Sequence, residues 1–314
     1  MSSKSSSLGH GITCIDTGLA RPHMAACYLI ESNGRLAIVE TGIKQTVDTL
    51  INLIEAKGYQ LSDVDWVIIT HVHLDHAGGA GLLMSNLPNA KLVVHPRGAR
   101  HMIDPSKLQA GAKVVYGEEK YNETYGDLIP IAEDKIHIAE DGSKVKLGMR
   151  EFIFIDSPGH AKHHFCVYDT ESQGFFTGDT LGLRYAELTT PDKHFCLIST
   201  TPVQFDPDAM KESIHRVIDF NPAALYLTHY GKVENLIDHQ IQLFRQIDWV
   251  CDMALSVKNK ENRQQLIETE MMNYALAELE KIGSPLTVDE QRAVLAPDIR
   301  LNAQGIDVWL SQVA

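Results

Sequence analysis

The chain has 314 residues, of which 44% are hydrophobic and 22% are charged, and its formal net charge is −13 at pH 7. This composition is typical of a soluble globular protein with one large domain or two ordinary ones, and no apolar run reaches the roughly 18 residues of a membrane span. The acidic balance, with no lysine or arginine cluster to offset it, argues against nucleic-acid and membrane partners and favours a small-molecule substrate. Five scattered cysteines without CxxC spacing and the lack of a secretory signal indicate reduced thiols in a cytoplasmic protein.

The N-terminal stretch MSSKSSSLGHG is polar and small, so residues 1–10 are predicted to be a disordered tail. From there to residue 239, short β-like runs alternate with helical patterns and short loops, which predicts a layered α/β domain over 11–239. The β-like runs are ACYLIES (26–32), RLAIVET (35–41), DWVIIT (65–70), KLVVH (91–95), EFIFIDS (151–157), HFCVYDT (164–170), GFFTGD (174–179) and ALYLTH (224–229).

Two helical patterns within this domain are well marked. Over 44–59 the apolar residues recur at i, i+3, i+4 and i+7, and Gly58 suits the C-terminal stop. Over 206–220, Asp206 can cap the helix and Pro207 suits its first turn. Both segments are therefore predicted to be amphipathic helices that cover a sheet.

Residues 97–130 carry few long apolar runs and look like an insertion or a lid. Three tyrosines fall here, at positions 116, 121 and 125. They either close over a site or anchor the insertion to the core, and the sequence favours neither.

The chain becomes strongly helical after Lys232, and residues 240–314 are predicted to be a helical C-terminal extension. One of its helices begins at TVDE, where Thr287 and Glu290 form a capping-box pattern. The extension is either a plain helical cap or also the surface of a homodimer.

The stretch DWVIITHVHLDHAGG (65–79) crowds ligand-type side chains at the end of an apolar run. His71, His73, Asp75 and His76 fall within six positions. In a continuing strand the first three would share one face and His76 would point away, so all four converge only if the strand ends near His71. Imidazoles and a carboxylate gathered in this way are typical of a transition-metal site, because a divalent cation removes the repulsion among them.

Three further residues of the same kind lie downstream. His160 follows a strand in DSPGH, Asp179 follows one in FFTGDT, and His229 follows one in LYLTHYG. Each has a glycine within two residues, so the repeated pattern is an apolar strand followed by a metal-type side chain. Strands that end in ligands at one edge of a sheet make a single concave site.

The motifs THVHLDHAGG, SPGH, TGDT and LTHYG, in this order and spacing, resemble those of the metallo-β-lactamase-fold hydrolases over about residues 10–235. The resemblance implies a four-layer αβ/βα sandwich and a site for two divalent metal ions. The implied ligands are His71, His73 and His160 for the first metal, Asp75, His76 and His229 for the second, and Asp179 as a bridge. Zinc is the first choice, although nitrogen and oxygen ligands without cysteine also suit iron or manganese.

The resemblance also implies the chemistry. A metal-bridging hydroxide would cleave an ester, thioester or lactone of a small molecule, with Asp75 taking up or relaying the proton. His164, four residues after His160, corresponds to a histidine that supports the site in relatives. It is therefore a candidate catalytic residue with a supporting or substrate-contacting role, and plain packing is the alternative. His163 stands where relatives carry glycine, so the turn there is expected to differ.

Five other residues are candidate supporting or substrate-contacting groups. Glu40 occupies a place where relatives commonly carry aspartate that orients a ligand. Arg184 and Tyr185 directly follow the TGDTLG motif, and His23 and His194 could line the pocket. For each of them, ordinary packing is the alternative.

The layout is most similar to that of the quinolone-signal thioesterase and of uncharacterised zinc-dependent hydrolases. Gly182 stands where lactonase relatives carry tyrosine, and neither a glutathione-binding set nor a flavodoxin domain is recognisable. The alternatives are a mononuclear iron enzyme similar to the persulfide dioxygenases, a phosphodiesterase, or a regulatory binding protein that retains the metal site.

Overall fold

A computed structural model describes residues 5–190, 193–200 and 202–313. Within them the chain forms two compact units. The first, here called the sheet unit, contains residues 5–156, 163–178 and 223–232. The second, here called the helical unit, contains residues 157–162, the described part of 179–222, and 233–313.

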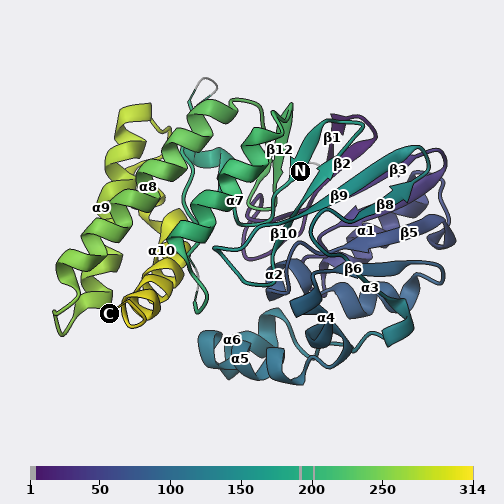
Figure 1. The fold of residues 1–314 in the computed structure, drawn as a ribbon, viewed down its shortest axis with the longest axis horizontal. Coiled ribbons are helices and arrows are strands. Elements are labelled where there is room, and N and C mark those ends of the chain that lie inside the picture. The colour runs from purple at the N-terminus through teal and green to yellow at the C-terminus, as the bar shows by residue number, and fades with distance from the viewer. Residues whose placement is uncertain (1–4, 191–192, 201, 314) are drawn as a thin grey trace. The chain divides into compact units, whose positions relative to one another are not determined.

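The first sheet is mixed (Figure 1). Its strands pair antiparallel from β1 to β4 and parallel from β4 to β7. In spatial order they are β1 (Ser5–Gly9), β2 (Ile12–Asp16), β3 (Ala26–Ser32), β4 (Arg35–Val39), β5 (Val64–Ile68), β6 (Lys91–Val94) and β7 (Ile136–Ile138).

The second sheet is mixed as well, with β11 and β12 running parallel and β8 to β11 pairing antiparallel. Its spatial order is β13 (Gly231–Val233), β12 (Ala224–Leu227), β11 (Gly174–Phe176), β10 (Phe165–Asp169), β9 (Arg150–Asp156) and β8 (Lys144–Leu147). Each of the eight β-like runs of the sequence overlaps one strand of these two sheets.

The main core lies between the two sheets, where buried aromatic side chains such as Tyr28, Phe152 and Phe165 pack together. A second apolar cluster joins the other face of the first sheet to helices of the same unit. These helices are α1 (Thr46–Ala56), α3 (Ala80–Asn86) and α4 (Pro96–Ile103). The helix predicted over 44–59 is confirmed as α1, which buries Val47 and Leu50.

The helical unit contains α7 (Pro207–Asp219), α8 (Leu236–Val257), α9 (Arg263–Ile282) and α10 (Val288–Leu310). Two predicted helix starts are confirmed. The Asp206 carboxylate accepts a hydrogen bond from the backbone nitrogen of Ala209 at the start of α7. Thr287 and Glu290 form the reciprocal capping box of α10.

The N-terminal segment differs from the predicted tail. Residues 1–4 lie outside the described residues, but Ser5–Gly9 forms β1, whose residues pair with Ile12–Ile15 of β2. A strand at the edge of a sheet is held by backbone hydrogen bonds and needs few apolar side chains, which is why the polar composition did not predict it.

Residues 97–130 form most of α4 together with α5 (Ser106–Tyr116) and α6 (Glu118–Thr124). Tyr121 and Tyr125 are buried in an apolar cluster with Leu74 and Ile43, and the ring of Tyr116 lies 5.6 Å from that of Tyr125. The tyrosines therefore anchor this segment to the sheet unit.

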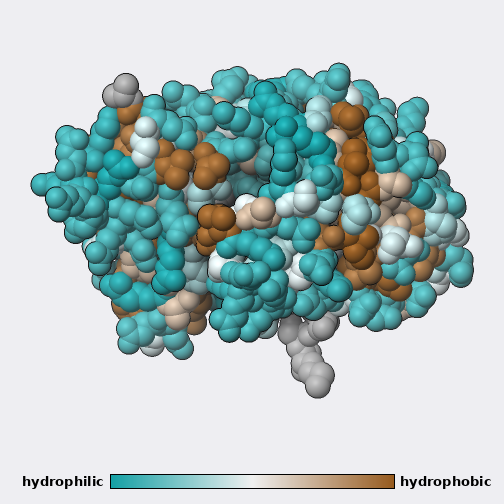
Figure 2. All heavy atoms as spheres, turned by 90° about the horizontal axis from the view of Figure 1, so that it is seen from below, coloured by the Kyte–Doolittle hydropathy of each residue, from teal (hydrophilic) through white to brown (hydrophobic). Residues whose placement is uncertain are grey.

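The face drawn in Figure 2 is largely hydrophilic and carries separate apolar patches. The large apolar side chains that are most exposed include Val114, Met149, Val203, Ile237 and Ile241. Among the residues that the structure describes, no helix is both long and apolar enough to cross a membrane.

Candidate metal centre

The residues of the HxHxDH motif, which are His71, His73, Asp75 and His76, converge because β5 ends before them. The strand stops at Ile68, and the chain turns through a loop into the short helix α2 (Leu74–Ala77). The ring of His71 consequently lies 4.4 Å from that of His73 and 4.0 Å from that of His76, measured between centroids. A strand continuing through these positions would have separated them.

The clearest set of candidate metal ligands in the sheet unit is Asp75, His76 and His229. One ligand atom from each lies within 4.8 Å of the other two. Oδ2 of Asp75 is 3.1 Å from Nε2 of His229 and 3.6 Å from Nε2 of His76. Ligand atoms around a tetrahedral ion with bonds of about 2.0–2.1 Å lie about 3.3 Å apart, so this spacing fits one shared metal ion.

The two imidazoles of this set are held by their other nitrogen. Nδ1 of His76 lies 3.1 Å from Oε1 of Glu40, and Nδ1 of His229 lies 2.8 Å from the carbonyl oxygen of Met24. Both oxygens are acceptors, so each Nδ1 carries the proton and each Nε2 keeps its lone pair for a metal. The donor set therefore fits a divalent ion in chemistry as well as in distance.

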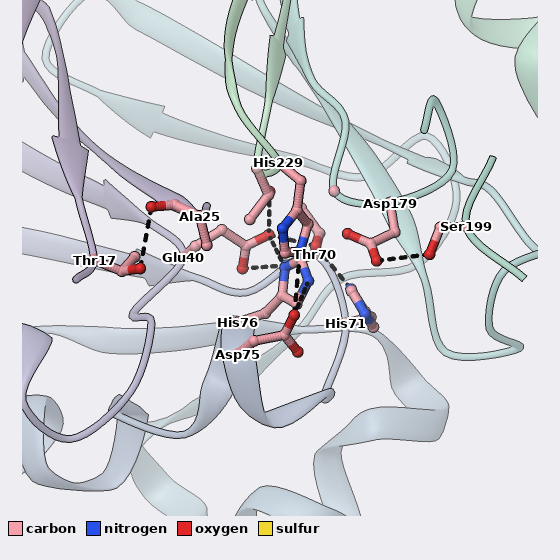
Figure 3. A network of polar contacts seen from close by, with 12 residues as sticks. Thr17, Ala25, Glu40, Thr70, His71, Asp75, His76, Asp179, Ser199 and His229 are labelled. Atoms are coloured by element: carbon pink, nitrogen blue, oxygen red, sulfur yellow. Dashed lines mark hydrogen bonds and ion pairs between the residues drawn. The ribbon is translucent and has the colours of Figure 1, made fainter. Parts of the chain in front are cut away.

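Glu40 also supports His71 (Figure 3). This carboxylate is fully buried and accepts hydrogen bonds from the backbone nitrogen and the hydroxyl of Thr70, and from the hydroxyl of Thr228. Because the Thr70 hydroxyl donates to Glu40, its oxygen accepts from Nδ1 of His71 at 3.1 Å. One carboxylate thus fixes the orientation of both His71 and His76.

The strand order explains these contacts. β4 is parallel to β5, so Glu40 and Thr70 leave the first sheet at the same edge. β11 is parallel to β12 in the second sheet, so Gly178 and Thr228 likewise follow the carboxyl ends of neighbouring strands.

His164 is fully buried beside these residues, and its ring lies 4.9 Å from that of His71. A Cβ atom added at Gly178 would come within 2.4 Å of Nε2 of His164 and 2.5 Å of the Thr70 hydroxyl. The glycine before Asp179 is therefore required by close packing as well as by its φ of +49°. The ring of His163 lies 5.6 Å from that of His73.

The remaining two predicted ligands belong to the helical unit, where they lie close to each other. Nε2 of His160 is 3.6 Å from Oδ2 of Asp179. Ser199 contacts both residues, since its hydroxyl donates to Oδ2 of Asp179 at 3.1 Å and its carbonyl oxygen accepts from Nδ1 of His160 at 3.1 Å. As with His76 and His229, Nδ1 of His160 carries the proton, so Nε2 is the nitrogen with the lone pair.

Of the other predicted contacts, Tyr185 is buried and its hydroxyl donates to Asp298 at 2.8 Å. Burial lowers the pKa of Arg184, and its Nε atom has no hydrogen-bond partner among the described residues. Burial, together with the charge of Arg184, also lowers the pKa of His194. Next to His194 lies His239, which the sequence did not single out.

His239 is fully buried, and burial lowers its pKa to about 4. Its Nε2 lies 2.8 Å from the carbonyl oxygen of Leu181, so Nε2 carries the proton and Nδ1 accepts from Nε2 of His194 at 3.3 Å.

In the sheet unit, the ring of His23 lies 5.1 Å from that of Tyr230.

Several supporting residues were missed from the sequence. Thr70 and Thr228 had a signal, because each stands directly before a predicted ligand histidine at the end of an apolar run, in IITH and LYLTH. Ser199 and the carbonyl of Met24 had none, since they act from loops far along the chain.

The family profile described as the Metallo-beta-lactamase superfamily matches residues 20–229, more than half of the chain. The chain belongs to the metallo-β-lactamase superfamily. The match contains all seven predicted ligands.

Relatives within this superfamily agree with the fold. The chain is 26% identical over 216 residues to the metallo-beta-lactamase fold-containing protein ST1585 of Sulfurisphaera tokodaii, which covers 68% of this chain and 75% of that protein. The solved structure of ST1585 matches with a TM-score of 0.66 at 21% identity, covering 95% of this chain and 98% of that one. A metallo-beta-lactamase family protein of Thermus thermophilus matches with a TM-score of 0.68 at 16% identity, covering 98% and 95%.

A further relative is the hydroxyacylglutathione hydrolase of Legionella pneumophila. It is 24% identical over 115 residues, which cover 37% of this chain and 33% of that protein. The predicted fold class, an αβ/βα sandwich with a C-terminal helical extension, is confirmed by the two mixed sheets with their helices and by the solved neighbours.

Proposed function

We propose that this protein is a dinuclear metal-dependent hydrolase that cleaves an ester, thioester or lactone of a small molecule. The observation that carries the proposal is the convergence of Asp75, His76 and His229, each imidazole presenting Nε2 because its Nδ1 is engaged. Membership of the superfamily and the relative named hydroxyacylglutathione hydrolase support hydrolysis as the reaction.

The proposed ligand sets follow the superfamily motifs residue by residue. His71, His73 and His160 would hold one ion, Asp75, His76 and His229 the other, and Asp179 would bridge them. When bound, two divalent ions supply Lewis acidity and lower the pKa of a coordinated water from about 15.7 to near 7. Zinc is our first choice for both ions, with iron or manganese as alternatives.

The chain's own residues have distinct roles in this proposal. Asp75 takes up or relays a proton, because its carboxylate lies beside Nε2 of His76 and Nε2 of His229. Glu40 holds His71 through Thr70 and holds His76 directly, so both rings keep the tautomer that a metal needs. His164 packs against His71 and keeps its ring in place.

We propose that Arg184 and His194 recognise the substrate, with Tyr185 and His23 shaping the walls of the pocket. The lowered pKa values of His194 and His239 keep these imidazoles neutral at pH 7, whereas Arg184 stays charged. A partly buried guanidinium beside neutral groups suits a carboxylate or another anionic group of the substrate. Arg184→Gln should therefore raise the KM for an anionic ester by about tenfold or more and leave the KM for a neutral ester unchanged.

The proposal is tested by metal analysis and a substrate panel. Purified protein would be analysed for zinc, iron and manganese and then assayed on p-nitrophenyl esters, acyl-thioesters, lactones and bis-p-nitrophenyl phosphate. We expect two metal ions per chain and turnover of at least one carboxylic ester, thioester or lactone.

Other results would favour other functions. Turnover of the phosphodiester alone would identify a phosphodiesterase, and one iron per chain with oxygen consumption on a persulfide would identify a dioxygenase. Two metal ions without turnover of any substrate would indicate a regulatory binding protein.

A further inference from the structure

The segment of residues 194–200, here called the 194–200 segment, is held mainly by side chains of the C-terminal helices. Its one strand-like contact is the bridge between Leu197 and Leu183. Gln242 of α8 accepts from the backbone nitrogen of Cys196 at 3.2 Å and donates to the carbonyl oxygen of His194 at 2.9 Å. Side-chain amides thus replace the backbone partners that a neighbouring strand would have supplied.

Gln246, one turn further along α8, repeats this pairing. It donates to the carbonyl oxygen of Cys196 at 2.6 Å and accepts from the backbone nitrogen of Ile198 at 3.3 Å. The segment is therefore fixed from one side as far as residue 198.

Asn302 of α10 forms hydrogen bonds with the two residues on either side of Ser199. Its Oδ1 accepts from the backbone nitrogen of Thr200 at 2.7 Å, and its Nδ2 donates to the carbonyl oxygen of Ile198 at 2.7 Å. The Thr200 hydroxyl also donates to the backbone carbonyl of Asn302 at 3.1 Å. Ile198, Ser199, Thr200 and Asn302 are all buried.

Ser199, between Ile198 and Thr200, contacts both candidate ligands of the helical unit. Its hydroxyl donates to Asp179 and its carbonyl oxygen accepts from Nδ1 of His160. One residue therefore sets the orientation of the carboxylate and the tautomer of the imidazole. A rotation of the peptide at Ser199 would disturb both.

We propose that the C-terminal helices are part of the metal centre, with Asn302 as a positioning residue that orients Asp179 and His160 through Ser199. The inference rests on the proposed function, because it takes these two residues to be metal ligands. It assigns a role to α10, which lies about 120 residues after Asp179 in sequence and beyond the matched region of the superfamily, 20–229.

The chemistry of an amide explains why asparagine stands at this position. Its NH2 group donates and its carbonyl oxygen accepts in a fixed relative geometry, which matches the Ile198 carbonyl and the Thr200 N–H. Alanine would leave both backbone groups buried without these partners, and they would recover hydrogen bonds only by moving. Ser199 lies between them and would move with them.

The test compares variants of the 314-residue chain loaded with metal. Asn302→Ala and Ser199→Ala are expected to weaken metal binding by roughly 10- to 100-fold, the range for residues that orient ligands. The affinity would be measured by competition with a chromophoric chelator. The cobalt-substituted protein would show a changed d–d absorption spectrum, which a purely structural defect would not produce.

Two further variants separate positioning from stability. Ser199→Thr keeps the hydroxyl and should bind metal within a few-fold of the parent. Arg263→Gln breaks the ion pair between Arg263 and Asp307, which joins α9 to α10 away from the 194–200 segment. It should lower the melting temperature without changing the metal affinity or the cobalt spectrum.

The outcomes are distinct. If Asn302→Ala and Ser199→Ala bind metal as tightly as the parent, or no more weakly than Arg263→Gln at a similar loss of stability, the inference is wrong. If Asn302→Ala does not fold, Asn302→Asp replaces it, because aspartate keeps an acceptor for the Thr200 N–H and loses the donor to the Ile198 carbonyl. Equal metal affinity of this variant and the parent would then overturn the inference. If the parent protein itself binds no metal, the proposed function fails instead.

Discussion

The sheet unit and the helical unit hold their candidate ligands by different means. In the sheet unit, the ligands follow strand ends, and their supporting groups, Glu40, Thr70 and Thr228, follow strand ends as well. In the helical unit, His160 and Asp179 lie in loops, and Ser199, which supports them, is flanked by residues that Asn302 holds about 100 residues later in the chain. Sheet pairing alone can place the first set, whereas the second depends on packed helices.

The two units should therefore differ in how well they tolerate amino-acid substitutions. A parallel sheet fixes the relative position of its strand ends through many backbone hydrogen bonds, so no single side chain is needed for that placement. A loop is held by only a few buried side-chain amides, so the loss of one of them is not compensated by other hydrogen bonds. We therefore expect substitutions remote from the ligands to matter more in the helical unit.

The largest expected effect tests whether both units contribute ligands. His71→Ala in the sheet unit and Asp179→Ala in the helical unit should each reduce hydrolysis at least about 1,000-fold and lower the metal content, because each removes a ligand. Metal analysis of the dialysed proteins and kcat/KM would be measured. His137→Ala, a change of the same type on β7, should leave both unchanged. Full activity of either ligand variant would remove that unit from the site.

The second prediction concerns the supporting carboxylate of the sheet unit. Glu40→Gln keeps the size of the side chain but replaces the negatively charged carboxylate that accepts hydrogen bonds from His76 and Thr70. The metal affinity should therefore fall roughly 10- to 100-fold. A chelator competition measures this loss. Glu40→Asp keeps the charge with a shorter reach and should fall between the parent and the glutamine variant. Equal affinity of all three proteins would contradict the role given to Glu40.

The third prediction probes packing beneath the site. Gly178→Ala would place a Cβ atom against His164 and Thr70 at a positive φ, so the free energy of unfolding should fall by about 2–4 kcal/mol. Gly111→Ala is the matched control, because a Cβ atom at this exposed position in α5 meets nothing within 4 Å. It should stabilise the protein by roughly 0.4–1 kcal/mol. Urea unfolding measures both changes.

The fourth prediction concerns pH and the helical unit. The pKa of His239 is about 4 in the folded protein against a usual 6.5, so the unfolded chain binds more protons between these values. The free energy of unfolding should therefore fall as the pH drops from 6.5 towards 4, by about 3 kcal/mol from this residue.

The control for this effect is His239→Gln, which keeps a donor for the Leu181 carbonyl but does not titrate. Urea unfolding at pH 7 and pH 4.5 should show a smaller pH dependence for the variant than for the parent. An identical dependence in the two proteins would exclude His239 as its source.

Much of the sheet unit could be predicted from the sequence because its signals are local. Apolar runs gave the strands that carry candidate ligands, and the HxHxDH spacing pointed to the cluster around His71. The edge strand β1 was missed because its backbone pairing leaves no mark on a polar sequence.

The helical unit was predictable in its elements but not in its contacts. The capping residues Asp206 and Thr287 marked helix starts correctly. Nothing in the sequence connects Asn302 to Ser199, because the hydrogen bonds of an amide depend on tertiary placement and follow no periodicity. Tyr185 was singled out for its place next to a motif, but nothing in the sequence indicates that its hydroxyl donates to Asp298.

The double contact of Glu40 has a thermodynamic consequence. The same carboxylate orders His71 through Thr70 and orders His76 directly, and the proposal assigns these histidines to different ions. Binding of the first ion would restrict the motion of Glu40. The entropic cost of binding the second ion would therefore be lower. We therefore expect the two ions to load cooperatively, with a single calorimetric transition at two ions per chain in the parent protein and two separate binding steps in Glu40→Gln.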